Sequence, residues 1–237
     1  MKKITKILFV MICFLSLTMT TGCGLFDMFK KESLEDALNH LEDCKNFTIT
    51  IDGTADVSMG SYSVSQPSDG FYKEDGTKQL MMAKDEGTPR YVYSELVDGE
   101  YITYDNYLYP TDNLELSTAY DYEKTRTSTV YLGIELDHED FTEEDDGLFI
   151  GDVEVLSEKF YQYYLKENAG GVGELGLIAS ISKFNIQVED NKVKSFDIEY
   201  TIKTTISDMK VTMNYRVSYT FDNYGSTTIT TPENINR

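Results

Sequence analysis

Cysteine thiols are the side chains of this 237-residue chain that are best suited to forming covalent bonds. Cys13 lies in an apolar stretch, Cys23 ends the sequence MTTGC, and Cys44 lies in LEDCKNF. A thiol can form a disulfide, attack as a nucleophile, bind a metal or carry an acyl chain. No base stands near Cys44 in the sequence, so we expect a half-buried structural thiol there. The residues before Cys23 indicate different chemistry.

Those residues have the pattern of a secretory signal. Lys2, Lys3 and Lys6 give a positive start, and residues 7–17 form an apolar stretch of eleven residues. A helix of that length is too short to cross a bilayer, which takes about 20 residues. The length suits the apolar segment of a signal peptide instead.

The sequence TTGC at 20–23 resembles the lipobox of bacterial lipoproteins, with Thr20 where leucine is usual. The resemblance implies that residues 1–22 are a lipoprotein signal peptide and that the Cys23 thiol is diacylated, for example with palmitate. Two or three acyl chains, at about 0.8 kcal/mol per buried methylene, make a lasting anchor. We therefore expect a lipidated tether at 23–32, on the extracytoplasmic face of the cell membrane. An ordinary signal peptide followed by chance by a cysteine is the alternative.

The charge of the chain limits its partners. The formal net charge is −20, and loss of the first 22 residues, with three lysines and no acid, brings it to −23. Nucleic acid is excluded as a partner, because its binding relies on Lys and Arg, whereas a basic envelope protein is permitted. The remaining 215 residues suit one domain at 33–237. After removal of residues 1–22 and acylation of Cys23, Cys44 is the only free thiol, so no internal disulfide can form. We expect a monomer.

Two further motifs could do chemistry. GVGELG at 171–176 matches the dinucleotide pattern G-x-G-x-x-G, which needs a strand before it and a helix after it. The sequence predicts the reverse order, so we interpret it as a connector. The acidic run Asp137–Asp146 offers oxygen ligands for Ca²⁺ but departs from the EF-hand pattern, which favours a solvated loop. Because His40 and His138 are the only histidines, a His-rich zinc site is not available. We expect no cofactor, no metal site, no catalytic residues and no enzyme.

Hydrophobic spacing predicts the elements that would position any site. Leu34, Leu38 and Leu41 recur at helical spacing after Ser33, which predicts a helix at 33–44, and a similar pattern predicts another at 153–168. Apolar and polar residues alternate elsewhere with the period of half-buried antiparallel strands. The alternation is clearest in the C-terminal third, which ends in a short strand within STTITTP. The prediction is an α+β domain with two helices and about eight to eleven strands.

Tyrosines are the remaining feature, with 18 in the chain and no tryptophan. Three pairs are spaced by two residues: Tyr91/Tyr93, Tyr107/Tyr109 and Tyr120/Tyr122. They are either ordinary strand and core residues or the lining of an aromatic cavity under a concave sheet. For such a cavity the predicted ligand-lining residues are Tyr200, Tyr215, Val217, Tyr219, Phe221 and Tyr163.

Three stretches carry a resemblance to a known superfamily. SLEDALNHLEDCKNFTITI, EDFTEEDDGLFI and the ending YRVSYTFDNYGSTTITTPENI, together with the lipobox, resemble LolA/LppX-like (LppX/LprG-type) lipoproteins. The resemblance implies a strongly curved antiparallel sheet, an unclosed half-barrel, with helices across its concave side. Several members hold acyl chains there and carry lipids or lipoproteins across the envelope. They share no catalytic residues.

Two functions remain open from the sequence. The first is a membrane-anchored lipoprotein that binds or carries a lipid or other apolar ligand in a sheet-and-helix cavity. The second is a structural or protein-interaction lipoprotein whose cavity is filled by its own tyrosines. The volume of side chains over the sheet distinguishes the two.

Overall fold

The computed structural model describes residues 33–85, 87–106, 113–168, 177–206 and 209–236. The chain divides into two units, Met1–Glu32 and Ser33–Arg237, and every described residue belongs to the second, which has its own hydrophobic core. The predicted signal peptide, the predicted tether and Cys23 therefore lie outside the described residues, as does GVGELG. Within the described part, no helix is both long and apolar enough to span a membrane.

Twelve strands of the described residues form one antiparallel sheet. Their spatial order is β7-β6-β5-β4-β3-β1-β12-β11-β10-β9-β8, with β2 paired to the second half of β1, so the sheet is open. The strands are β1 (Asn46–Met59), β2 (Tyr62–Pro67), β3 (Gly70–Asp75), β4 (Lys78–Asp85), β5 (Thr88–Val97), β6 (Glu100–Asp105), β7 (Glu115–Leu116), β8 (Phe141–Asp145), β9 (Leu148–Gly151), β10 (Ile178–Glu189), β11 (Lys192–Ile206) and β12 (Met209–Asp222).

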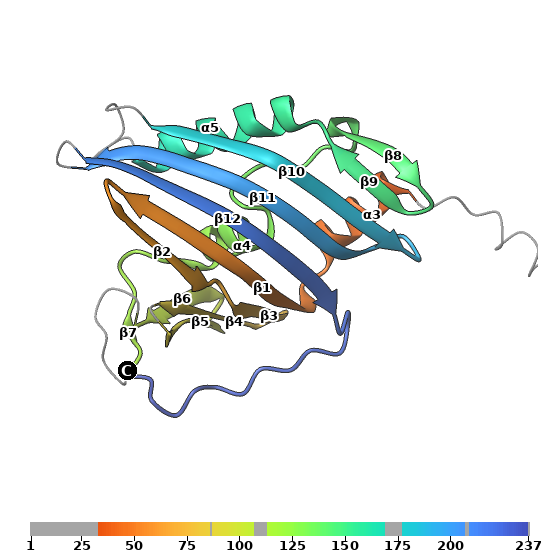
Figure 1. Ribbon diagram of the computed structural model, residues 1–237. Helices are drawn as coiled ribbons and strands as arrows, with labels where there is room; N and C mark the ends of the chain where they lie inside the picture. Colours follow the sequence, from red (N-terminus) through yellow and green to blue (C-terminus); the bar gives the residue numbers. More distant parts are fainter. Residues whose placement is uncertain (1–32, 86, 107–112, 169–176, 207–208, 237) are drawn as a thin grey trace, which may run out of the picture. The chain divides into compact units, whose positions relative to one another are not determined.

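The helices of the described residues lie on one face of this sheet, which curves around them (Figure 1). They are α3 (Leu34–Asp43), α4 (Tyr122–Val130) and α5 (Val153–Asn168), with a short 3-10 helix at His138–Asp140. The structure confirms the predicted α+β class with a curved, unclosed antiparallel sheet. It has more strands than the eight to eleven predicted and a third helix, α4.

Strand β1 is where the sheet bends. Its first half pairs with β3 and its second half with β2, while β12 runs along its whole other edge. Gly53 lies at the change of partner, and a side chain there would place Cβ 2.5 Å from the carbonyl oxygen of Arg216. Only glycine allows the two backbones to approach this closely.

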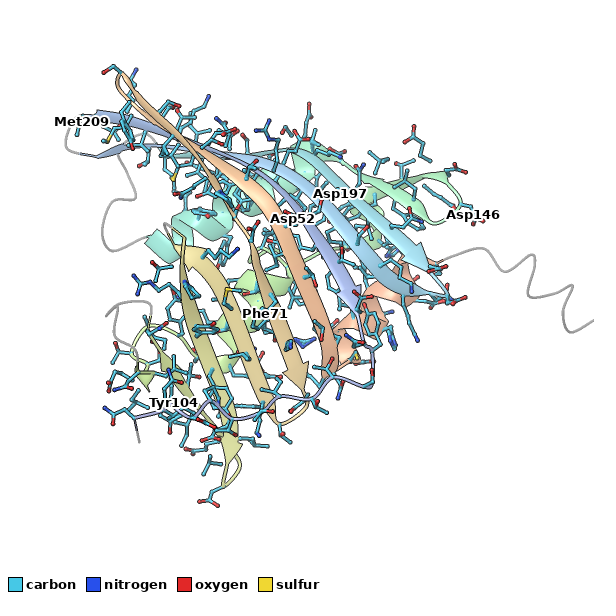
Figure 2. The ribbon with its side chains drawn as sticks, turned by 60° about the horizontal axis from the view of Figure 1, so that its bottom comes forward. Asp52, Phe71, Tyr104, Asp146, Asp197 and Met209 are labelled. Carbon is cyan, nitrogen blue, oxygen red and sulfur yellow. The ribbon has the colours of Figure 1, made fainter. Side chains whose placement is uncertain are left out.

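The outer face of the long strands is polar, as the alternation predicts. Asp52 of β1 and Asp197 of β11 lie on either side of Ser218 of β12 in the same cross-strand row (Figure 2). The Ser218 hydroxyl donates to Asp197. The alternate residues of these strands point to the core, where Phe196, Ile198 and neighbouring apolar residues are almost fully buried. The alternation in the sequence therefore predicts correctly which side chains of these strands face solvent and which face the core.

Local signals in the sequence explain several elements. The Ser33 hydroxyl accepts the backbone N–H of Asp36 and so caps α3. Asp98 and Gly99 both have positive φ, 52° and 91°, which is the two-residue hairpin turn that Asp-Gly favours between β5 and β6. The predicted helix at 153–168 coincides with α5.

Helix α4 has no counterpart in the prediction, because its buried face is mostly polar. Asp121 caps it, and Tyr122, Thr125, Arg126 and Thr129 are buried along it. Sequence periodicity detects apolar stripes, and this helix has none. Its position depends on hydrogen bonds to distant residues, which are described below.

The C-terminal segment corrects a second expectation, since STTITTP is not a strand. It crosses the ends of β1, β3 and β4: Asn46 exchanges two hydrogen bonds with the backbone of Thr227, and Asp75 accepts the N–H of Ile229. The segment then covers Tyr93 and Tyr104 on the outer face of the sheet (Figure 2). Side chains at strand ends satisfy its backbone, so no strand ladder forms.

The acidic run Asp137–Asp146 is also more ordered than the predicted loop. It begins with the 3-10 helix, capped by Asp137, and continues as the edge strand β8. Asp140 is buried and forms an ion pair with Lys159 of α5. The run therefore attaches the edge of the sheet to a helix.

Candidate functional site

A cavity of about 270 Å³ lies between the inner face of the sheet and helices α4 and α5. Its walls come from seven separate parts of the chain. The lining residues are Ile51, Ser68, Asp69, Gly70, Ala83, Lys84, Ser128, Thr129, Leu132, Phe160, Tyr163, Tyr164, Tyr200, Val217 and Tyr219. Most of these side chains are aromatic, aliphatic or small, so the cavity is suited to an apolar ligand.

Helix α5 forms one wall. Leu156 and Phe160 are almost completely buried and anchor the helix against the sheet. The Phe160 ring contacts the rings of Tyr164 and Tyr200 edge to face, at centroid distances of 4.9 and 5.2 Å. Tyr163 and Tyr164 follow Phe160 by three and four residues, so they occupy the same side of the helix one turn further on.

The inner face of β11 and β12 forms the opposite wall. Ile198 pairs with Val217, and Tyr200 pairs with Tyr215, so residues two apart on each strand share this face. The rings of Tyr200 and Tyr215 stack at 4.6 Å. These contacts fix the orientation of the Tyr200 ring from both sides.

The structure brings four of the six predicted lining residues together at this cavity: Tyr163, Tyr200, Val217 and Tyr219. Tyr215 stands beside it against Tyr200. Phe221 lies on the same inner face of β12 but is 1% exposed. Its ring lies 4.8 Å from that of Phe196 in the core. The alternation of apolar and polar residues predicts which side chains lie on the inner face. It does not predict which of them pack in the core and which line a cavity.

Among the described residues, the paired tyrosines Tyr91/Tyr93 and Tyr120/Tyr122 do not line the cavity. Tyr91 and Tyr93 belong to the outer cluster under the C-terminal segment. Tyr122 opens α4, and Tyr120 lies in the loop before it. Tyr107 and Tyr109 lie outside the described residues.

Sequence reasoning missed the wall formed by the β2–β3 turn, β4 and α4. Asp69 and Lys84 form an ion pair at 3.2 Å, and their side chains are 33% and 41% exposed. They are the charged members of the lining and mark its solvent side. Ion pairs between residues 15 apart leave no periodic signal, and the other missed members, such as Ser128 and Thr129, belong to the unpredicted α4.

Burial raises the pKa of three phenols in the cavity wall. Desolvation raises the pKa of Tyr164 and Tyr219, and it raises the pKa of Tyr200 well above its ordinary value, with neighbouring tyrosines adding to the effect. An ordinary phenol is already neutral at pH 7, and burial extends the neutral range of these three to higher pH.

Beside the cavity, β3 and α4 share a buried polar network. The Glu74 carboxylate is fully buried and accepts hydrogen bonds from the Tyr72 and Tyr122 hydroxyls, with Nε of Arg126 3.5 Å away. The network continues through Gln79, whose amide donates to the Tyr72 hydroxyl at 2.7 Å. The carboxylate, hydroxyls and amide all have internal hydrogen-bond partners, and Arg126 adds its charge, so the arrangement is a structural link.

Arg126 extends this link to α3. Its guanidinium donates to the carbonyl oxygens of Leu41, Glu42 and Cys44, which end that helix. Arg126 also stands over the Phe47 ring. One side chain thus joins α4 to the end of α3 and to β3, and it fixes the α4 wall of the cavity.

The remaining residues with reactive or metal-binding side chains lie away from this cavity. Cys44 is half-buried, and its Sγ donates to the Asn46 carbonyl oxygen at 3.3 Å. His138 pairs with Asp137 at the surface. Across the described ranges, no group of three His, Cys, Asp or Glu side chains is arranged to hold a metal ion.

No model of a known protein family matches the chain, and no curated protein matches it. Among solved structures, it is similar to the ywiB protein from Bacillus subtilis, with 11% identity over 74% of this chain and 92% of the other, at a TM-score of 0.23. It is also similar to a DUF1329 family protein from Desulfovibrio piger, with 6% identity over 84% and 93% of the chains, at a TM-score of 0.28.

Proposed function

We propose that this protein is a membrane-anchored lipoprotein of the cell envelope that binds an apolar ligand in the cavity between the sheet, α4 and α5. The observation that carries the proposal is the cavity itself, because a core filled by its own tyrosines would leave no such space. Phenols and aliphatic groups form most of its wall, beside the hydroxyls of Ser68, Ser128 and Thr129, and they favour the binding of an apolar group. The anchor at Cys23 and the LolA/LppX-like character remain part of the proposal, on the residues of the lipobox and the C-terminal ending.

The size of the cavity limits the ligand. Small-molecule sites usually measure about 300–1,000 Å³, and this cavity, at about 270 Å³, lies just below that range. It accommodates one short acyl chain or a compact ring but not a lipid with several chains. At its solvent side Lys84 is paired with Asp69, so the charges at the entrance balance each other.

The proposal is tested by filling the cavity. Residues 24–237 contain the whole Ser33–Arg237 unit with its own core, so the test uses this soluble form and a fluorescent acyl probe. Val217→Phe places a ring in the cavity, whereas Thr220→Phe places the same ring on the exposed outer face of the same strand. We expect saturable probe binding that Val217→Phe weakens at least about tenfold, a loss of roughly 1.4 kcal/mol, and that Thr220→Phe leaves unchanged. Equal binding by both variants, with native circular dichroism, would place the ligand elsewhere.

A further inference from the structure

The strands β1, β2, β11 and β12 end together at one end of the sheet, on the left in Figure 1. We call residues 57–64, which form the β1–β2 hairpin, and residues 209–213, which begin β12, the hairpin end. Met59 pairs with Tyr62 on one side and with Val211 on the other, so the two segments lie side by side. The hairpin end is therefore one surface that is built from two distant parts of the chain.

Exposed apolar side chains gather at the hairpin end. Residues two apart on a strand share a face, and the pairing places Tyr62, Val64 and Met209 on the inner face of the sheet. Their exposed fractions are 60% for Tyr62, 36% for Val64 and 46% for Met209, which Figure 2 shows at the tip of the long strands. A single exposed apolar residue needs no explanation, but a group of them at one end of a molecule indicates an interaction surface.

The charge of the hairpin end differs from that of the chain as a whole, which has 41 acidic residues and a net charge of −20. Residues 57–68 contain no charged side chain. Residues 201–214 contain two lysines, Lys203 and Lys210, which are exposed, and one acid, Asp208, which lies outside the described residues. This end is therefore neutral to weakly positive on a strongly negative chain.

The size and charge of this surface favour a lipid bilayer as its partner. A stable protein interface buries about 800 Å² on each partner, far more than three partly exposed side chains offer, and two copies of so negative a chain repel each other. Binding at a bilayer surface scales with the apolar area that is buried, and tyrosine suits the interface because its ring is buried while its hydroxyl stays hydrated. Asp56, the acid that precedes the hairpin end on β1, is already paired with Arg216.

We propose that the hairpin end contacts a lipid bilayer directly, with Tyr62, Val64 and Met209 in the interfacial region. The ammonium groups of Lys203 and Lys210 then lie at the level of the lipid head groups. This contact is separate from the acyl anchor proposed at Cys23, and it does not require a ligand in the cavity. It orients the domain, because anionic lipid attracts this end and repels the acidic remainder.

The hairpin end also lies near the cavity. Met59 and Ala55 are four residues apart on β1, a distance of about 13 Å along the strand. Ala55 pairs with Tyr215, whose ring stacks on that of Tyr200 in the cavity wall. A bilayer at the hairpin end is therefore the nearest source of an apolar ligand for the cavity, a consequence that rests on the proposed function, whereas the contact itself does not.

The test uses the soluble form, residues 24–237, with vesicles of phosphatidylcholine alone or with added phosphatidylglycerol. The chain contains no tryptophan, so one introduced indole reports on its own surroundings. Tyr62→Trp places this reporter at the hairpin end. Leu116→Trp is the matched control, because Leu116 is 65% exposed on β7, at one edge of the sheet, and follows Glu115.

With phosphatidylcholine vesicles we expect the emission of Tyr62→Trp to shift to shorter wavelength and to be quenched by lipids with brominated acyl chains, whereas that of Leu116→Trp stays unchanged. Added phosphatidylglycerol should weaken binding at low salt, and high salt should restore it, because salt screens the negative charge of the domain. Replacing two exposed side chains, Tyr62→Ser with Val64→Ser, should reduce sedimentation with vesicles at least about tenfold. Leu116→Ser should bind as wild type.

Unchanged emission of Tyr62→Trp with both kinds of vesicle, or an equal shift in Leu116→Trp, would overturn the inference. Val217→Phe separates it from the proposed function, because this variant fills the cavity and leaves the hairpin end intact, so it should bind vesicles as wild type does. Acyl-probe binding without vesicle binding would remove the membrane contact alone. Vesicle binding through the hairpin end without acyl-probe binding would support the contact and remove the proposed ligand site.

Discussion

The two halves of the sheet's inner face are held to their helices by different forces. Under α3 and α5, the strands β1 and β10–β12 present Phe196, Ile198 and other apolar side chains to the core. Under α4, the strands β3–β6 present Glu74, Gln79, Ser94 and Thr103, all buried. The apolar half gains from non-directional burial, whereas the polar half depends on each hydrogen bond being made.

The difference explains the position of the cavity. It lies where the two halves meet, between the aromatic side chains of α5 and the hydroxyl-bearing end of α4. Apolar side chains repack easily to fill space, but hydrogen bonds hold α4 at a fixed distance from its strands. The polar network therefore fixes the position of the α4 wall of the cavity.

Removing Arg126 from the buried polar network should lower the stability of the fold more than any other change considered. Arg126→Ala leaves the Glu74 carboxylate buried without its cation and frees the carbonyl oxygens that end α3. We expect the free energy of unfolding to fall by about 3–5 kcal/mol, measured by urea denaturation. Arg216→Ala is the control, because Arg216 pairs with Asp56 on the outer face with 62% of its side chain exposed, and about 0–1 kcal/mol is expected there. Equal losses in the two variants would show that the buried link is not structural.

High pH should weaken the fold through its buried tyrosines. Burial raises the pKa of Tyr131 to about 12, with Arg126 lowering it and Glu42 raising it. A raised pKa means that the folded state keeps its proton while the unfolded state loses it, so stability is complete below about pH 10 and falls as the pH rises toward 12. For Tyr131 alone the loss is roughly 2–3 kcal/mol. Urea titrations at pH 8 to 11 should show a smaller fall in Tyr131→Phe than in wild type; identical slopes would contradict the assignment.

Removing a hydroxyl should have opposite signs at two tyrosines. The buried Tyr131 hydroxyl has no hydrogen-bond partner among the described residues, whereas the Tyr224 hydroxyl donates to the Val193 carbonyl at 2.8 Å. Tyr131→Phe should stabilise the protein by about 1 kcal/mol and Tyr224→Phe should destabilise it by a similar amount. Thermal unfolding at pH 7 measures both, and a loss in Tyr131→Phe would indicate a partner for its hydroxyl.

The apolar half should tolerate small losses. Ile198→Val removes one methylene from a residue that is 1% exposed, and the expected cost is about 0.5–1.5 kcal/mol. A cost as large as that of Arg126→Ala would mean that packing in this half is as specific as the hydrogen bonding in the other.

The same contrast decided what could be predicted from the sequence. The apolar half has periodic signals: alternation gave the long strands, and Leu34, Leu38 and Leu41 gave α3. Arg126 and Glu74 are 52 positions apart in sequence and belong to no periodic pattern, so neither the network nor α4 was predicted. At the cavity, the alternation along β11 and β12 predicted Tyr200, Val217 and Tyr219. The wall that includes Lys84 and Leu132 was not predicted, because it depends on how distant segments meet.

The most direct test of the cavity as a ligand site is to identify what the folded protein carries. Residues 24–237 are purified without detergent, extracted with organic solvent and examined by mass spectrometry for bound lipid. We predict a stoichiometric single-chain apolar compound that is absent from Val217→Phe. A clean extract, together with failure to take up an acyl probe, would contradict the account and direct attention to a basic protein partner in the envelope.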